Sequence, residues 1–256
     1  MKNITIIIPV FKLGEGERKN LFAKAIESTQ GNNVVVVGSA EDIEVVNELN
    51  LGKNVKTIVN TTNNRDYQKQ VNIALDEIKT EFFSVLEYDD VYTPIWFKNV
   101  ERYISSESDN IFAYLPLTEI VDVNFGPVGY ANEAVWASSF SEEIGYYDSQ
   151  SLEDYLNFNV SGGVFRREEF LQLGGLKESM KISFWYEFLL RALYKGKRIY
   201  VIPKVGYIHT VGREESLTKM TMNNMEEKEA NWWIDLAKKE YFFPHDRNKT
   251  DRKSVV

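Results

Sequence analysis

The chain contains no cysteine and has fewer basic than acidic side chains. Without cysteine it can form no disulfide, thiolate metal site or cysteine nucleophile, which is compatible with the cytosol. Its 30 Lys and Arg residues face 38 Asp and Glu residues, a formal net charge of -8. Proteins that hold nucleic acid through its phosphates need an excess of positive charge, so we expect no binding to a nucleic-acid backbone.

Long apolar runs are also missing. No stretch of the sequence approaches the roughly 20 apolar residues of a membrane-spanning helix. The apolar run at residues 4–8 is too short for the core of a signal peptide, and no small-residue cleavage pattern follows it. We therefore expect a cytoplasmic protein without a transmembrane segment, and peripheral association with a membrane stays open.

Short apolar runs instead alternate with amphipathic segments. Hydrophobic residues make up 43% of the 256-residue chain, enough for a large core and one main folding unit. The runs are rich in β-branched residues and show little alternation, which predicts strands buried on both faces of a parallel sheet. Helical stripes between them predict right-handed βαβ units in a doubly wound sheet. The runs are residues 4–8, 34–37, 55–59 and 82–86, and the stripes fall at residues 21–29, 43–49 and 67–78.

The second half of the chain has a less regular pattern. Thr93, a helix-capping residue followed by Pro94, predicts a helix that runs to about residue 104. Residues 118–159 lose regular periodicity, yet aromatic residues such as Trp136, Tyr146 and Tyr147 favour an ordered binding surface there. The other predicted elements are strand 111–117, strand 163–166, a short helix closed by Gly174-Gly175, helix 184–195, strands 198–202 and 205–209, and helix 225–239.

An acidic cluster, Glu87-Tyr88-Asp89-Asp90, follows the fourth apolar run. In an open α/β sheet, ligands bind beyond the carboxyl ends of the strands. Carboxylates this close together repel unless something neutralises them, and a divalent cation that bridges to a diphosphate does so. A solvated acidic turn that caps the helix at Thr93 is the alternative, and taken alone the cluster is a weak signal.

The order of motifs along residues 4–218 resembles the family 2 nucleotide-sugar glycosyltransferases of GT-A fold. The run 4–8 with Pro9 and Phe11 is similar to the first strand of that family, and Asn72 matches an Asn of a later helix. Glu87-Tyr88-Asp89 falls on the D-x-D metal motif. The other matching segments are residues 162–170 with Leu173-Gly174-Gly175-Leu176, residues 189–193 with Gly196, and His209 with Ser216.

This resemblance implies a fold and a domain organisation. The fold would be a GT-A-like doubly wound α/β sheet, mostly parallel and flanked by helices, with a C-terminal helical extension. Residues 1–218 would form the glycosyltransferase domain, with 1–117 as its nucleotide-binding half and 118–218 as its acceptor half. Residues 219–256 would be a C-terminal helix and tail.

The resemblance also implies an activity, the transfer of a sugar from a nucleoside-diphosphate sugar to an acceptor hydroxyl with inversion. A divalent metal, Mn²⁺ or Mg²⁺, would neutralise charge on the leaving diphosphate, and a carboxylate base would take the acceptor proton. His209 would be a metal ligand, but it could equally be a buried imidazole that hydrogen-bonds to a neighbouring carbonyl. The implied donor-binding residues are Pro9, Phe11, Asn72, Glu87, Tyr88 and Asp89, and the implied metal ligands are Asp89, Glu87 and His209.

Two departures from the family pattern affect donor binding. The Asp that reads the nucleotide base after the second strand is missing from Val37-Gly38-Ser39-Ala40-Glu41-Asp42, where Glu41 or Asp42 could substitute only after a shift. The Ala-Arg-Asn triplet appears as Gln70-Val71-Asn72 and so lacks its Arg, although Arg65 and Lys69 lie earlier on the same predicted helix.

A third departure affects the catalytic base. The family's Glu-Asp pair falls on Phe184-Trp185, and neither residue can accept a proton. Glu187 is turned by about 200° from position 185 on a helix, and it could instead be an exposed partner of Arg191. Asp154 or its neighbour Glu153 is the other candidate base. Trp185 and Tyr186 could stack on a sugar or belong to the core.

Three functions follow from these residues. The first is an active glycosyltransferase whose acceptor is a glycan, a lipid or a protein. The second is a degraded relative that binds a nucleotide-sugar or glycan without turnover. A sugar nucleotidyltransferase is the weakest, because Gly14-Glu15-Gly16-Glu17 would repel a triphosphate. The Gln70-Val71-Asn72 and Glu87-Tyr88-Asp89-Asp90 segments also resemble phage-encoded members of the family, which would place the protein in a host cytoplasm.

Overall fold

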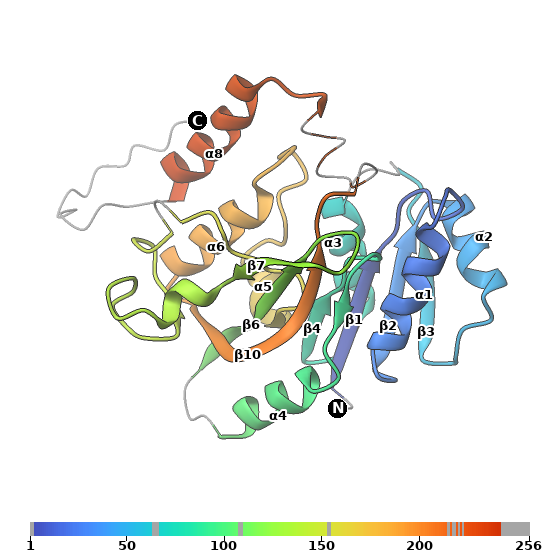
Figure 1. Ribbon diagram of the computed structural model, residues 1–256, viewed down its shortest axis with the longest axis horizontal. Coiled ribbons are helices and arrows are strands. Elements are labelled where there is room, and N and C mark those ends of the chain that lie inside the picture. Colours follow the sequence, from blue (N-terminus) through green and yellow to red (C-terminus); the bar gives the residue numbers. More distant parts are fainter. Residues whose placement is uncertain are drawn as a thin grey trace.

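The computed structural model describes residues 3–62, 67–106, 110–152, 155–213, 216, 219, 221 and 223–241. A mixed sheet of ten strands forms its centre (Figure 1). The strands are β1 (Ile4–Pro9), β2 (Asn33–Gly38), β3 (Val55–Val59), β4 (Phe82–Val85), β5 (Val91–Tyr92), β6 (Ile111–Val121), β7 (Pro127–Ala131), β8 (Tyr146–Tyr147), β9 (Val164–Arg166) and β10 (Arg198–Thr210).

The sheet has the mostly parallel arrangement that the sequence predicts. Its strands follow the order β3-β2-β1-β4-β9-β6-β10-β5, while β7 pairs with β6 and β8 pairs with β10. The pairings make β3, β2, β1, β4, β6 and β10 run in one direction. The carboxyl ends of these strands therefore meet at one edge, where an α/β sheet binds its ligands.

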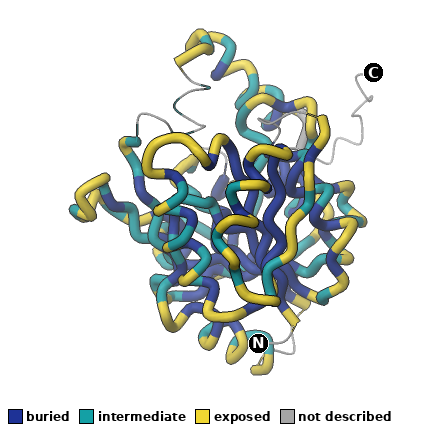
Figure 2. Tube along the Cα trace, turned by 90° about the vertical axis from the view of Figure 1, so that its right-hand side faces the viewer, coloured by how far each residue is buried: buried dark blue, intermediate teal, exposed yellow. Residues whose placement is uncertain are grey.

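Helices cover both faces of the sheet and explain why its central strands are mostly apolar on both sides. Within β1, Ile6 packs into one core and Ile7 into the core on the opposite face. Figure 2 shows buried segments, in dark blue, at the centre of the molecule, with exposed segments, in yellow, around them. One core is built with α1 (Arg18–Ser28), α2 (Ala40–Glu48) and α4 (Trp96–Ser106), and the other with α3 (Tyr67–Glu77), α5 (Arg167–Gln172), α6 (Phe184–Tyr194) and α8 (Glu227–Tyr241). Among the described residues, no helix is long and apolar enough to cross a membrane.

The edge strand β3 differs from the prediction that all four early strands are buried on both faces. Lys56, Thr57 and Val59 are exposed, and Val59 keeps 45% of its surface accessible. The reason is position, because β3 ends the sheet and pairs only with β2. A β-branched run therefore predicts a strand here but not its burial.

The long strand β10 replaces the two strands predicted at 198–202 and 205–209. It pairs with β6 from Arg198 to Thr210, with register shifts between Ile202 and Val205 and again between Val205 and Tyr207. Such irregularities bend a strand without ending it. The interruption at Pro203 thus marks a bulge, and the chain continues from one end of the sheet to the other.

The irregular segment 118–159 is partly ordered into secondary structure. The end of β6 and β7 form a hairpin, and a short 3₁₀ helix follows at Glu133–Trp136. Asp122 closes the hairpin because its Oδ1 accepts hydrogen bonds from the amides of Asn124 and Gly126, both at 2.8 Å. This is the local side-chain turn that Asp favours, and it was missed because the flanking strands are half exposed.

The helix after the acidic cluster, α4, begins at Trp96, two residues later than predicted. Thr93 does not cap it with its side chain, because the hydroxyl donates to the Val205 carbonyl at 2.9 Å. Trp96 opens the helix instead, is fully buried and donates from its indole to the Gly162 carbonyl at 2.9 Å. Thr93 and Trp96 therefore attach α4 to β10 and to the loop before β9.

We predict that Gly206→Ala lowers stability. A Cβ at Gly206 would lie 2.2 Å from the Trp96 ring, which is held by its own hydrogen bond and cannot move away. The cost should be roughly 1–3 kcal/mol in urea unfolding. Gly129→Ala is the matched control, since a Cβ there meets nothing within 4 Å, and its effect should stay within about 0.5 kcal/mol. Equal effects of the two substitutions would contradict this packing.

Candidate functional site

A cleft of about 810 Å³ opens at the carboxyl ends of β1, β4 and β10. The beginnings of α3 and α6 and the side of α8 complete its walls. Three carboxylates line it, those of Glu87, Asp89 and Glu229, together with the imidazole of His209. The cleft is therefore in the position where a sheet of this kind binds ligands.

The acidic turn, residues Glu87-Tyr88-Asp89-Asp90, is formed by the chain as it leaves β4. The Leu86 amide still donates to the Ile7 carbonyl at 2.9 Å, so the turn starts directly from the sheet. The Asp90 amide then donates to the Glu87 carbonyl at 3.1 Å, which closes the turn before β5. This geometry brings three carboxylates together within four residues.

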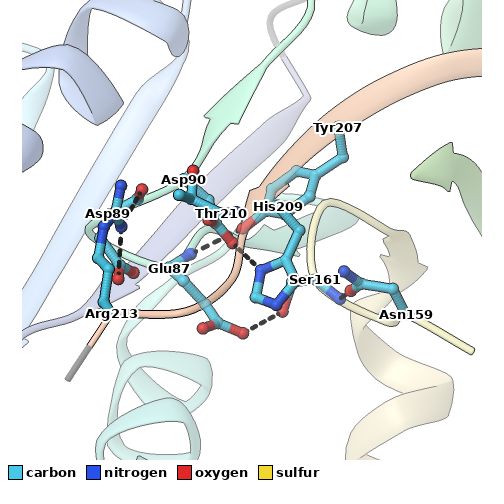
Figure 3. Close-up of polar contacts among 9 residues, drawn as sticks. All are labelled: Glu87, Asp89, Asp90, Asn159, Ser161, Tyr207, His209, Thr210 and Arg213. Carbon is cyan, nitrogen blue, oxygen red and sulfur yellow. Dashed lines mark hydrogen bonds and ion pairs between the residues drawn. The ribbon is translucent and has the colours of Figure 1, made fainter. Parts of the chain in front are cut away.

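Asp90 is the most buried of these carboxylates, with no exposed side-chain surface. One of its oxygens lies 2.7 Å from Nδ1 of His209, and the other accepts the Thr210 amide at 2.9 Å (Figure 3). Both partners belong to β10, so Asp90 joins the acidic turn to the end of that strand. The partner of His209 is thus a carboxylate, and the alternative of a carbonyl partner is wrong.

Glu87 is held from two sides. Ser161 donates its hydroxyl to the Glu87 carboxylate at 2.7 Å, and the Glu87 amide donates to the Tyr207 hydroxyl at 3.1 Å (Figure 3). Burial, with added repulsion from Asp90, raises the pKa of Glu87 to about 7. Burial alone would lower the pKa of His209, but the nearby carboxylates, Asp90 first, raise it to about 9.

Asp89 forms a separate ion pair. Its carboxylate lies 2.7 Å from the Arg213 guanidinium, which also donates to the Asp89 carbonyl at 2.7 Å. Burial and the Asp90 charge nevertheless keep the pKa of Asp89 above its ordinary value. The three carboxylates of the turn therefore point to three different partners: Ser161, Arg213 and His209.

A divalent cation fits part of this arrangement. One ligand atom from each of Glu87, Asp90 and His209 lies within 4.8 Å of the other two. Carboxylate oxygens and an imidazole nitrogen are suitable ligands for metals such as Mn²⁺. The set differs from the predicted Asp89, Glu87 and His209, because Asp89 is paired with Arg213 and Asp90 takes its place.

The predicted donor-binding residues divide into two groups. Pro9, Phe11 and Tyr88 line the cleft with Glu87 and Asp89.

Asn72 instead does not line the cleft; it lies one turn further along α3 than Gln68 and holds a turn. Its amide donates to the Leu176 carbonyl at 2.9 Å, and its carbonyl accepts the Leu176 amide at 3.0 Å. A Cβ at Gly175 would lie 2.7 Å from the same side chain. The contacts of Asn72 are therefore those of a residue that fixes the Gly174-Gly175-Leu176 turn.

Glu187 is buried and paired, not exposed as the sequence alternative supposed. Only 1% of its side chain is accessible, both oxygens lie 2.9 Å from the Arg191 guanidinium, and Lys177 lies 3.2 Å away. Arg191 also donates to the carbonyls of Leu173 and Gly175. Glu187 does not line the cleft, so its placement does not support a role as base. The other predicted base, Asp154, and its neighbour Glu153 lie outside the described residues.

The acids proposed to read the base of the nucleotide are not equivalent. Asp42 is buried, accepts the Leu13 amide at 2.6 Å and accepts the Ser39 hydroxyl at 2.8 Å, so its oxygens are used within the fold. Glu41 is exposed on α2 and does not line the cleft. Lys69 pairs with Glu178 at 3.4 Å, and Arg65 lies outside the described residues.

The aromatic residues also divide. Trp136 and Tyr146 pack on Tyr200, at ring distances of 6.0 and 4.9 Å, and Tyr147 is 3% exposed. These three do not line the cleft. Trp185 and Tyr186 do line it, although each is also packed against the core.

Sequence reasoning missed several residues of the site. The sequence gives Asp90 only as part of the acidic cluster, predicts no role for Ser161 or Arg213, and predicts the last helix only as a C-terminal extension. In the structure α8 contributes Glu229, whose carboxylate lies 2.7 Å from Lys181 across the cleft. The one available signal was the amphipathic pattern of α8, which required a partner surface.

No family model matches the sequence, and no curated protein is similar to it in sequence. Solved structures of S. aureus TarS are similar in fold. TarS 1–349 in complex with UDP-GlcNAc has a TM-score of 0.63 at 18% identity and covers 85% of this chain and 61% of that one. TarS 1–349 in complex with UDP has a TM-score of 0.60 at 20% identity, and the alignment covers 90% of this chain and 68% of that one. The structure of TarS has a TM-score of 0.60 at 18% identity, and the alignment covers 91% of this chain and 42% of that one.

The chain has a GT-A-like fold. It spans about three fifths of the length of TarS 1–349 in the alignment with the UDP-GlcNAc complex. At 18–20% identity the similarity establishes the fold, and activity has to be argued from the site.

The raised pKa values predict that the metal-free protein loses stability from pH 5 to pH 9. The pKa of Glu87 is about 7 in the folded state and 4.5 in the unfolded state, so the folded state binds this proton more tightly. The contribution of Glu87 to stability therefore falls as pH rises through this range. His209, raised from 6.5 to about 9, stabilises fully below 6.5 and loses this effect through 9. The decline should amount to several kcal/mol in urea unfolding with EDTA, at about 1.4 kcal/mol for each unit of pKa shift. In His209→Gln the decline above pH 7 should flatten, and a rise in wild-type stability would contradict the assignment.

Glu187→Gln should reduce stability far more than it alters any ligand affinity. The substitution leaves the buried Arg191 without its charge partner, at an expected cost of about 3 kcal/mol. Glu48→Gln is the control, because the exposed pair with Lys19 should contribute less than about 1 kcal/mol. A Glu187→Gln protein of normal stability that binds donor but fails to turn over would restore Glu187 as the base.

Proposed function

We propose that this protein is a metal-dependent, inverting glycosyltransferase that moves a sugar from a nucleoside-diphosphate sugar to an acceptor hydroxyl. The observation that carries the proposal is the acidic turn with His209 at the inner wall of a cleft beyond the strand ends. Support comes from the GT-A-like fold, which is shared with TarS structures in complex with UDP-GlcNAc and UDP.

The charge of this donor site favours a bound cation. A diphosphate brings negative charge to a turn with three carboxylates, while Arg213 is paired with Asp89. Glu87, Asp90 and His209 would hold the ion, and Asp89 would join them if its pair with Arg213 opened. A bound Mn²⁺ or Mg²⁺ supplies charge neutralisation for the leaving diphosphate.

The residues around the ion would keep its ligands in position. Asp90 accepts at Nδ1 of His209 and so leaves Nε2 available, the carboxylate–histidine arrangement that orients metal-binding imidazoles. Ser161 fixes the Glu87 carboxylate in the same way. If Asp89 moved toward the ion, Arg213 would be freed to meet a diphosphate oxygen.

Asp154 is retained as the proposed base for the acceptor hydroxyl. Leu156 and Phe158, which line the cleft, follow it closely in the sequence.

Phe184 and Trp185 line the cleft at the start of α6, and neither can take a proton. This observation favours a second function, the binding of a nucleotide-sugar or glycan without turnover.

Residues 1–117 would bind the nucleotide and residues 118–218 the acceptor, whether glycan, lipid or protein, while α8 in the 219–256 extension adds a wall to the cleft. A cytoplasmic location is proposed from composition. The solved structures compared above are of a bacterial protein, and the resemblance to phage-encoded members stays a prediction from sequence.

A screen of the purified protein against UDP-, GDP-, dTDP- and CMP-sugars tests the donor. With Mn²⁺ or Mg²⁺, one of these should raise the unfolding temperature, and EDTA should remove the effect. Sugar release in the same samples would establish a transferase. Metal-dependent binding without release, even with added acceptors, would favour the binding protein, and no binding to any of them would overturn the donor site.

Asp89→Ala and Asp90→Asn should each weaken metal-dependent nucleotide binding by at least about tenfold. Asp89→Ala should leave the fold intact, because its loss frees only Arg213 at the surface of the cleft. Asp76→Ala, an exposed Asp on α3, is the matched control and should bind like the wild type. Unchanged affinity with and without Mn²⁺ in Asp89→Ala would remove Asp89 from the site, and the same result in Asp90→Asn would remove Asp90.

A further inference from the structure

Tyr67 carries a buried polar atom that the fold leaves without a partner. The residue begins α3 and is 8% exposed, and its hydroxyl has no partner at hydrogen-bond distance among the described residues, although the side chains of Trp185 and Ser161 are near enough to lower its pKa. Among the described residues that line the cleft, no other has such an atom. Buried hydroxyls almost always find a partner, so one on a side chain that lines a cleft is a candidate contact for a ligand bound there.

The surroundings of this hydroxyl are aromatic. The Tyr67 ring lies 5.3 Å from that of Phe184, which is followed by Trp185, and both line the cleft. On the same wall, Phe158 stacks on Tyr186 at 5.8 Å. Rings of this kind pack against the C–H faces of a sugar, and a hydroxyl among them can bond one of its oxygens.

The hydroxyl is also close to the proposed donor site. Burial, followed by the charge of Glu87, raises the pKa of Tyr67 above its ordinary value, so the phenol is neutral and keeps its proton. Glu87 belongs to the group that would hold the cation and the diphosphate. The part of a sugar nucleotide that lies beyond its diphosphate is the sugar to be transferred.

We propose that the Tyr67 hydroxyl donates a hydrogen bond to the transferred sugar and so selects sugar nucleotide over free nucleotide. The inference rests on the proposed function, since it takes the cleft as a donor site. The sugar would thus contact Tyr67 beside Phe184 and Trp185, the two residues that fall where the family pattern has its acidic pair.

Tyr67→Phe tests this, because it removes the hydroxyl and keeps the ring. Calorimetric titrations with Mn²⁺ would use UDP and UDP-GlcNAc, or the pair that the donor screen identifies. The dissociation constant of the sugar nucleotide should rise about three- to tenfold, while that of the free nucleotide changes less than about twofold. Equal weakening of both, or no weakening, overturns the proposal while the donor site stands.

Tyr147→Phe is the matched control, since its buried hydroxyl donates to the side-chain carbonyl of Asn132 at 2.9 Å and the residue does not line the cleft. It should lower the urea midpoint and leave the ratio of the two affinities unchanged. Tyr67→Phe should keep or raise the midpoint, because its hydroxyl has no bond to lose in the free protein. A lowered midpoint for Tyr67→Phe overturns the proposal whatever ligands bind, and a wild type that binds no sugar nucleotide overturns the proposed function together with it.

Discussion

Repulsion among the carboxylates of the acidic turn is the constraint on which the rest of the site depends. Glu87, Asp89 and Asp90 come within four residues, and each is kept by a different segment: the loop before β9, the segment after β10, and β10 itself. Burial strengthens both the repulsion and the compensating bonds. The turn therefore depends on the segments around it. The pairing of β10 with β5 brings His209 and Thr210 to Asp90, where they compensate its charge.

Much of the fold could be predicted because the sheet is covered on both faces. That coverage makes strands such as β1 and β2 mostly apolar with little alternation, which is visible without knowing any partner. The acidic turn was also visible, since a strand end in such a sheet is a ligand position wherever it occurs. The exposure of the edge strand β3 and the bulge in β10 could not be predicted, because edges and bulges depend on neighbouring strands that are distant in sequence.

The chemistry of individual side chains was harder to predict because it depends on what lies opposite each of them. Spacing correctly paired Glu187 with Arg191, but it could not reveal that both are buried. It placed Asp89 in the metal motif, yet Arg213 lies more than a hundred residues away. Nor could any pattern indicate that the Tyr67 hydroxyl would remain without a partner. Such properties belong to the packed state and to no segment alone.

The turn at Gly174-Gly175-Leu176 is gripped from two sides, by Asn72 from α3 and by Arg191 from α6. Three of the segments that make the sequence resemble a known enzyme family thus serve to join helices to one another. Their contacts hold the fold together, and a chain that had lost its reactive groups could keep them equally well. Relatives gathered through these segments will therefore include proteins with quite different catalytic fates, and only the residues of the cleft can sort them.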